Sequence, residues 1–419
     1  MKVFAAQLAA AEAALAEILT MQQPADAALH HFFRTHPQLG QSDRAFVAET
    51  VFGVLRRRYM LEHAFGATVT PRQLVLAFLN RVSGLSMRAL EPLLKRDEAR
   101  WLAAGATRTP AELPLEVAAE LPAWLIARLT PKLPNAEILA LGRALAQAAP
   151  LDLRVNSLLA TRAKVLAQFA REGIAAQPTP YAPCGIRLTD KPALQRHPLF
   201  TSGKIEVQDE GSQLLCLLVS PKRHEMVVDF CAGAGGKTLA LGALMHTQGR
   251  LYAFDISERR LQRLKPRLKR SELSNVHPQL IRDENDARIK RLAGKIDRVL
   301  VDAPCSGFGT LRRNPDLKWR QTEAGIVELA TKQRAILDAA ATLLKPGGRL
   351  VYATCSFLCA ENQDIVTAFL ATHPRFRLLP ANAVLAQQKI LLDTGEYLQL
   401  WPHHHGCDGF FAAVMEHTA

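Results

Sequence analysis

The chain has 419 residues, of which 48% are hydrophobic and 22% are charged, and its formal net charge is +13. Such a chain is long enough for two or three globular domains, and its basic excess favours a polyanionic partner, nucleic acid before a membrane surface, over a merely solubilising charge. The seven cysteines are scattered without CxxC or CxxH spacing, and no apolar run approaches the ~20 residues of a membrane span. These features argue against a disulfide framework, a zinc module and a membrane-spanning protein, and they predict a cytoplasmic one.

An all-helical domain is expected over residues 1–145. Apolar residues recur at helical spacing from Phe4 to Leu19, which predicts an amphipathic N-terminal helix. Ser42 and Asp43 can cap a later helix that ends at Arg56–Arg58, where positive charge suits the helix dipole. That arginine triplet is either a contact for a phosphate backbone or a solvated helix end.

Residues 146–221 read as a small α/β module. The alternation over 151–156 predicts a strand, residues 161–172 a helix, and residues 185–188 a second strand. A polar segment then leads into the last domain, and its Lys204 is a candidate contact for RNA phosphate.

Residues 222–419 alternate between predicted strands and helices. Strands are expected at 226–230, 251–255, 278–281, 299–301 and 350–354. The long helix expected over 322–344 would be closed by a C-cap at Pro346-Gly347-Gly348. This alternation predicts an α/β fold with an open, mainly parallel sheet covered by helices on both faces, whose ligands bind beyond the carboxyl ends of the strands.

A glycine-rich loop follows the first strand of this domain. Its glycines precede a helix, and Asp255 ends the next strand 26 residues after Asp229, close to the ~20 of a nucleoside-binding unit. Gly236-Lys237-Thr238 also matches the end of a phosphate-binding P-loop, but Cys231 stands where that motif needs glycine. A nucleoside-bearing cofactor is therefore favoured, and a P-loop nucleotide hydrolase is the second interpretation.

Two cysteines follow two predicted buried strands. Cys305 lies in Asp302-Ala303-Pro304-Cys305-Ser306, and Cys355 follows the strand at 350–354. Both strand ends are expected at one edge of the sheet, so the thiols should share a cleft. The basic residues Arg312, Arg313 and Lys318 could lower a thiol pKa and bind RNA phosphates. Buried cysteines that only fill the core are the alternative.

This residue set suits methylation of a cytosine ring. A thiolate that adds to C6 makes C5 nucleophilic toward an electrophilic methyl group, after which the C5 proton must leave and the thiol must be eliminated. That sequence of steps needs a nucleophilic cysteine, a carboxylate and a second group for proton removal or enzyme release. Cys355, Asp302 and Cys305 together supply these groups.

Seven motifs resemble the Sun/NSUN family of RNA (cytosine-C5)-methyltransferases. In chain order they occupy Val207–Leu214, Asp229–Thr238, Phe254–Ser257, Asn285–Arg288, Asp302–Asp316, Tyr352–Phe357 and Asp408–Ala413. The N-terminal helices more loosely resemble a NusB-like RNA-binding domain. The resemblance implies a Rossmann-like methyltransferase domain, S-adenosylmethionine as the cofactor, structured RNA as the partner, ribosomal RNA first, and a monomer.

The resemblance also implies roles for single residues. Cys355 would be the nucleophile, Cys305 would assist product release, and Asp302 would lie between cofactor and base. Asp255 would bind the ribose hydroxyls and Asp286 the adenine. The cofactor loop would consist of Cys231, Ala232, Gly233, Ala234, Gly235, Gly236 and Lys237. One departure is visible, because the family loop more often reads CAAPGGKT and Gly233-Ala234 replace Ala-Pro here, which frees the backbone.

Three alternatives stay open at this point. The same chemistry could act on transfer RNA, or the chain could be a non-catalytic RNA-binding factor of ribosome assembly. The run His403–His405 has only Cys407 nearby as a further ligand, so a surface loop is favoured over a metal site. No metal is expected.

Overall fold

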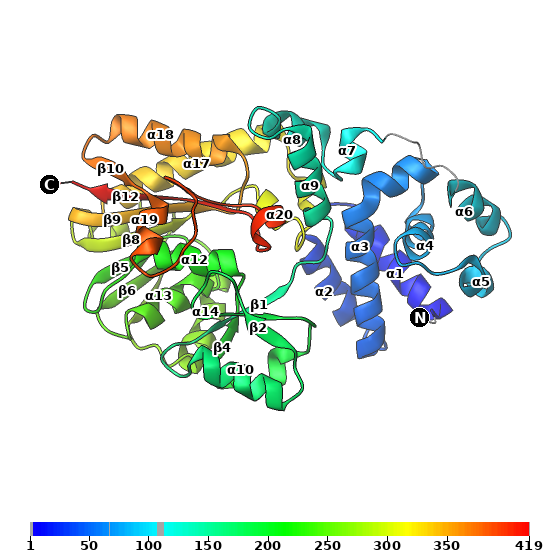
Figure 1. The fold of residues 1–419 in the computed structure, drawn as a ribbon, viewed down its shortest axis with the longest axis horizontal. Helices are drawn as coiled ribbons and strands as arrows, with labels where there is room; N and C mark the ends of the chain where they lie inside the picture. The colour runs from blue at the N-terminus through cyan, green and yellow to red at the C-terminus, as the bar shows by residue number, and fades with distance from the viewer. Residues whose placement is uncertain (1–2, 67, 107–112, 419) are drawn as a thin grey trace. The chain divides into compact units, whose positions relative to one another are not determined.

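A computed structural model describes residues 3–66, 68–106 and 113–418 (Figure 1). The chain folds into two compact units. We call Met1–Ala148 together with Thr310–Glu323 the helical unit, and Ala149–Gly309 together with Ala324–Ala419 the sheet unit. The chain therefore leaves the sheet unit shortly after Cys305 and returns to it fourteen residues later, which the sequence did not predict.

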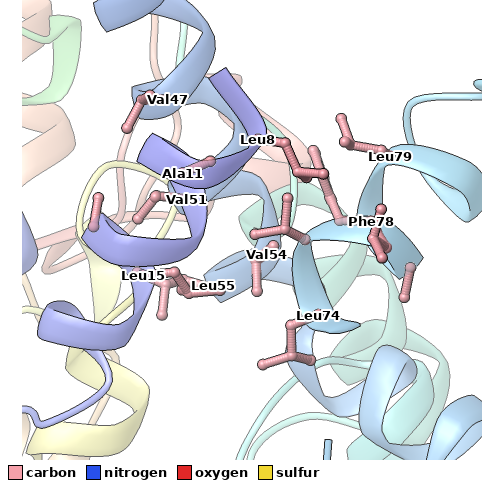
Figure 2. Packing of buried hydrophobic residues seen from close by; sticks show 14 of the residues in the cluster. Leu8, Ala11, Leu15, Val47, Val51, Val54, Leu55, Leu74, Phe78 and Leu79 are labelled. Carbon is pink, nitrogen blue, oxygen red and sulfur yellow. The ribbon is translucent and has the colours of Figure 1, made fainter. Parts of the chain in front are cut away.

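The helical unit packs around the helices α1 (Ala5–Ile18), α3 (Gln41–Phe65) and α4 (Pro71–Arg81). Apolar side chains from the three helices meet in its core, as Figure 2 shows for Leu15, Leu55 and Leu74. A Cβ atom at Gly53 would lie 2.2 Å from the ring of Phe78, so a glycine is required where α3 approaches α4. The unit's remaining helices are α2 (Ala25–Thr35), α5 (Met87–Leu90), η1 (Glu91–Leu93), α6 (Glu98–Ala106), α7 (Leu115–Ala118), α8 (Ala123–Leu129), α9 (Asn135–Leu145) and α16 (Leu317–Arg320).

The structure refines two sequence predictions about α3. Its N-cap is Gly40, whose N–H donates to the carboxylate of Asp43 at 3.2 Å, so Ser42 and Asp43 lie inside the first turn. The helix also continues past the arginine triplet to Phe65, with a kink at Arg57, where φ is −114° and ψ is 15°. The triplet therefore lies at a bend in the middle of the helix.

The sheet unit begins with a small antiparallel sheet in the order β2-β3-β1-β4. The predicted strands appear as β1 (Leu151–Val155) and β3 (Gly185–Leu188), and the predicted helix as α10 (Arg162–Arg171). The added elements are β2 (Ala176–Pro178), η2 (Leu194–Arg196), α11 (Pro198–Thr201) and β4 (Ile205–Val207). The small sheet belongs to the same compact unit as the large one.

The large sheet has the order β10-β12-β9-β8-β5-β6-β7, and β11 pairs with β12. The five strands from β9 to β7 pair in parallel, as predicted, and β12, β10 and β11 (Leu398–Leu400) add an antiparallel edge that was not predicted. The strands are β5 (Met226–Asp229), β6 (Arg250–Asp255), β7 (Val276–Leu280), β8 (Ile296–Asp302), β9 (Leu344–Thr354), β10 (Phe376–Leu379) and β12 (Phe410–His417).

Helices cover both faces of the large sheet (Figure 1). Leu300 and Val351 face α12 (Glu210–Val219), α13 (Gly236–Leu244) and α19 (Ala381–Ala386), whereas Val299 and Leu350 face α17 (Glu323–Ala341) and α18 (Gln363–Thr372). Successive residues of one strand thus enter opposite cores, which makes parallel strands read as continuous apolar runs. The other helices are α14 (Glu258–Arg270), α15 (Ala287–Lys290), η3 (Phe308–Thr310), η4 (Cys359–Glu361) and α20 (Pro402–His405).

The predicted C-cap at Pro346-Gly347-Gly348 is wrong, because α17 ends at Ala341 and those three residues lie within β9. Gly347 has φ of +77°, so the glycine serves a turn in the strand's first half. Among the described residues, no helix has both the length and the apolar character needed to cross a membrane.

Candidate active site

The two cysteines lie side by side just beyond the carboxyl ends of β8 and β9. These parallel strands pair up to Asp302 and Ala353, so the turns that follow them start at the same edge. The Cys305 and Cys355 Sγ atoms are 3.3 Å apart, and the Cys355 backbone N–H donates to the Cys305 Sγ at 3.3 Å. Residues fifty positions apart thereby form one pair of thiols, both partly buried.

Cys305 is held as a thiol in this arrangement. The hydrogen bond with Cys355 raises the pKa of Cys305 well above its ordinary value, and burial and the negative charges of Cys355 and Glu361 act in the same direction. The sequence expectation that nearby basic residues lower a thiol pKa is therefore wrong for Cys305.

Asp302 is paired with a lysine of the glycine-rich loop. The Lys237 Nζ lies 2.7 Å from a carboxylate oxygen of Asp302. Burial alone would lower the pKa of Lys237, but the charge and hydrogen bond of Asp302 outweigh it, and Cys355 adds to the rise. Lys237 is thus a cation that is paired with the Asp302 carboxylate.

The glycine-rich loop adopts a conformation that needs glycine. Gly233 and Gly235 have φ of +57° and +86°. No atom lies within 4 Å of the position that a Cβ would take at Gly233, so the loop is open there, whereas a Cβ at Gly235 would collide with Leu264. The Arg267 guanidinium donates to the Ala234 carbonyl at 2.6 Å, which restrains the loop where the family's usual proline is missing.

Two carboxylates border this loop. Asp255 accepts the Gly233 N–H at 2.8 Å and the Ser257 N–H at 2.7 Å, which fixes its carboxylate at the end of β6. Asp286 accepts the Arg288 and Arg282 N–H groups and caps α15.

These residues fit S-adenosylmethionine. The open face at Gly233 leaves room for a ligand to approach the backbone, and Asp255 offers a fixed carboxylate for sugar hydroxyls. The neighbouring Ile256 is 57% exposed and provides an apolar surface that suits the flat face of a base. The same edge of the sheet therefore carries both the nucleoside site and the two thiols.

The four residues predicted to contact RNA differ in exposure. Lys318 and Arg312 belong to the helical unit, and each is 5% exposed. Arg313 is half-buried in the same segment, and Lys204 is exposed in the sheet unit. His403–His405 form the short helix α20.

The sequence reasoning missed Glu361 and the polar residues around it. The Glu361 carboxylate is fully buried and accepts hydrogen bonds from Ser306 and Gln333, as well as from Ser356. The only local signal was the serine that follows each cysteine.

Comparisons with known proteins identify relatives of the chain. A family model described as 16S rRNA methyltransferase RsmB/F matches residues 216–416, and one for the ferredoxin-like domain of RsmF/B-like methyltransferases matches residues 121–195. The chain is 32% identical to the probable ribosomal RNA small subunit methyltransferase B of Synechocystis, over 93% of this chain and 95% of that protein. Ribosomal RNA small subunit methyltransferase B of Yersinia pseudotuberculosis is also 32% identical, with 96% of each chain covered.

A solved structure shows the same likeness across the whole chain. The crystal structure of PH0851 has a TM-score of 0.81 and 26% identity, with 99% of both chains covered. The similarity thus includes the helical N-terminal region as well as the sheet unit.

Proposed function

The chain belongs to the RsmB/F family of S-adenosylmethionine-dependent methyltransferases, and from this premise we propose that it methylates C5 of a cytosine in small-subunit ribosomal RNA. The observation that carries the proposal is the 3.3 Å approach of the Cys305 and Cys355 sulfur atoms beyond neighbouring parallel strands. The ribosomal substrate is supported by the names of the relatives in Synechocystis and Yersinia pseudotuberculosis and by the chain's net charge of +13.

Cys355 is the nucleophile in this proposal. Its sulfur forms a bond to C6 of the cytosine, and the electron pair of the C5–C6 double bond becomes available at C5. S-adenosylmethionine, when bound, supplies the electrophilic methyl group that C5 receives. Lys237, whose pKa the Cys355 charge helps to raise, stabilises the thiolate before the attack.

Asp302 orients the base. Its carboxylate lies 2.7 Å from the Lys237 ammonium and can accept a hydrogen bond from the polar edge of a cytosine. A base can reach this group only when it is unstacked from the RNA, so the target lies in an opened or looped segment.

Cys305 completes the reaction. Once the Cys355 sulfur is bonded to carbon, its negative charge and its hydrogen bond no longer raise the pKa of Cys305. Cys305 can then give up its proton to solvent and, as thiolate, take the proton from C5. The electrons of the C5–H bond restore the double bond and expel Cys355 as a thiolate.

The test is bisulfite sequencing of total RNA from cells that lack the gene and carry either the wild-type chain or a variant. The wild type should restore one protected cytosine in small-subunit ribosomal RNA, and Cys355→Ala should not. Cys305→Ala should accumulate a covalent adduct between protein and RNA. Protection of a transfer RNA instead would keep the chemistry and replace the substrate. If Cys355→Ala restored protection in full, the mechanism would be wrong.

A further inference from the structure

A buried carboxylate joins the two cysteine turns to each other. Glu361 ends the short helix η4 that follows Cys355, and its side chain is 0% exposed. One oxygen accepts the Ser306 hydroxyl at 2.6 Å and also accepts the Ser356 hydroxyl. The other accepts the Ser306 backbone N–H at 2.8 Å. Each serine directly follows one of the two cysteines.

The rest of the surroundings hold this carboxylate in place. The Gln333 amide donates to Glu361 at 3.0 Å and to the Pro304 carbonyl at 2.9 Å. Helix α17 therefore also contacts the turn that contains Cys305. The Tyr352 hydroxyl donates to the Glu361 backbone carbonyl at 2.6 Å, which ties η4 to β9. The next residue, Asn362, donates to the Ser356 carbonyl at 2.9 Å.

The donors are neutral, which is unusual for a carboxylate with no exposure to solvent. Among the described residues, the hydrogen bonds to the Glu361 side chain come from two hydroxyls, one backbone N–H and one amide. A buried charge is generally retained in a protein either because it is paired with a cation or because it has a function. These donors satisfy the carboxylate by hydrogen bonding and direct it at both turns.

Resting on the proposed function, we infer that Glu361 is a positioning residue that fixes the two cysteines at their reactive separation through Ser306 and Ser356. The Cys305 and Cys355 Sγ atoms approach to 3.3 Å although the two turns come from different strands. The Glu361 carboxylate, which both serines share, keeps the two turns at a fixed separation while the base enters and while Cys355 is bonded to the cytosine. Misplacement of reacting groups by about 1 Å can reduce rates by about 100-fold.

The charge of Glu361 has a second consequence. It contributes to the raised pKa of Cys305, behind the hydrogen bond with Cys355 and burial. Loss of the charge should therefore lower the pH at which Cys305 becomes the thiolate base, which moves the rising limb of the pH–rate profile to lower pH, in addition to any loss of rate. A purely structural residue would lower the melting temperature without moving this limb.

The experiment compares Glu361→Gln and Glu361→Asp with the wild-type chain. Gln removes the charge at nearly the same size, and Asp keeps the charge but is too short to reach both serines. Glu361→Gln should lower kcat by about 100-fold, change KM for RNA by less than about 2-fold and shift the pH limb. Glu361→Asp should lower kcat and leave the limb in place.

Glu210→Gln is the matched control. Glu210 is also 0% exposed in the sheet unit, but its carboxylate accepts the backbone N–H groups of Tyr181 and Ala182. This variant should leave the pH profile unchanged. Ser306→Ala and Ser356→Ala each remove one link to Glu361 and should lower kcat less than additively when combined.

A covalent probe separates this inference from the proposed function. RNA that carries 5-fluorocytosine has no C5 proton to lose, so methyl transfer should trap the Cys355 adduct. If the wild-type chain forms no adduct and no 5-methylcytosine, the proposed function fails. If the wild type reacts and Glu361→Gln traps the probe at the wild-type rate with an unshifted pH profile, the positioning role fails while the function stands.

Discussion

The segment Asp302–Glu323, which begins with the motif Asp302–Asp316, is continuous in sequence but is divided between the two folding units. Its first half, Asp302–Gly309, belongs to the sheet unit and carries Cys305, whereas its second half, Thr310–Glu323, belongs to the helical unit. Each half is fixed by a buried carboxylate from outside the motif. Glu361 binds the first half with neutral donors around it, and Glu120 binds the second half through a lysine.

The second half is a structural anchor. The Lys318 ammonium donates to the Glu120 and Arg56 carbonyls at 3.0 and 3.2 Å and lies 3.8 Å from the Glu120 carboxylate. The Asp316 carboxylate accepts the Ala25 N–H at 3.2 Å, at the first residue of α2. Basic residues that follow the cysteine loop can therefore anchor a segment of chain inside one folded unit.

Glu120 has a second task that makes it sensitive to mutation. Its carboxylate accepts the Tyr59 and Met60 N–H groups at 3.1 and 3.0 Å, just after the kink at Arg57. Glu120→Ala would leave these groups and Lys318 without their partner, so the helical unit should lose about 3–5 kcal/mol of unfolding free energy. Denaturant unfolding followed by circular dichroism measures this loss. Glu49→Ala, at an exposed position of α3, should change stability by less than about 0.5 kcal/mol.

A buried carboxylate of the sheet unit gives a contrasting pH dependence. Burial raises the pKa of Asp229 from the ordinary 3.8 to about 7, although the Thr238 hydroxyl donates to it at 2.6 Å. The folded state then binds the proton more tightly than the unfolded state, so stability is full below about pH 4 and falls as the pH rises toward 7. The loss from this group is about 4 kcal/mol at most.

Asp229→Asn should remove that contribution. Unfolding free energies measured between pH 4 and pH 7 should decline less steeply in the variant than in the wild type. An equal slope in both proteins would show that Asp229 is already ionised in the folded state at pH 4.

Lys318→Met should have a smaller effect than Glu120→Ala. Methionine keeps most of the buried volume, and Glu120, whose pKa burial already raises, can take up a proton when its cation is removed. We expect a loss of about 1–3 kcal/mol near neutral pH. Stability greater than that of the wild type would show that the desolvation of Lys318 outweighs its contacts.

The pKa of Lys318 also determines how the unfolding free energy should change at alkaline pH. Burial lowers the pKa of Lys318 to about 8, below that of an unfolded lysine. The unfolded chain therefore holds this proton more tightly, and wild-type stability should rise from about pH 8 toward pH 10. Lys318→Met should lack this rise.

The sequence was informative where a local pattern determines the structure. The apolar runs before Cys305 and Cys355 predicted parallel strands, and the topology of such sheets predicted that their ends would meet. The Glu361 contact with Ser306 joins residues 55 positions apart, and no local pattern encodes it. The kink at Arg57 occurs in a triplet that contains neither proline nor glycine. It is stabilised by a residue distant in sequence, because the Glu120 carboxylate accepts the Tyr59 N–H just after the kink.

The burial of Lys318 was not predicted either, because its partner is distant in the sequence. Lysine is almost always exposed, so a basic run beside a catalytic loop favours an RNA contact until a distant partner is known. Lys318 is buried because Glu120, 198 positions earlier, offers both a carbonyl and a carboxylate. The pairing depends on the return of the chain to the helical unit, which only the tertiary fold shows.

Trp319 provides the mildest test of the anchor. Its ring stacks on Tyr59 with centroids 4.5 Å apart, and the Arg58 guanidinium lies 4.5 Å from the ring centre. Trp319→Leu keeps an apolar side chain but removes both ring interactions, so the helical unit should lose about 1 kcal/mol. The loop that bears Cys305 continues directly into this second half. If the anchor restrains that loop, kcat should fall together with the unfolding free energy. A variant that loses stability but keeps the wild-type kcat would confine the anchor to folding and leave the positioning of Cys305 to Glu361.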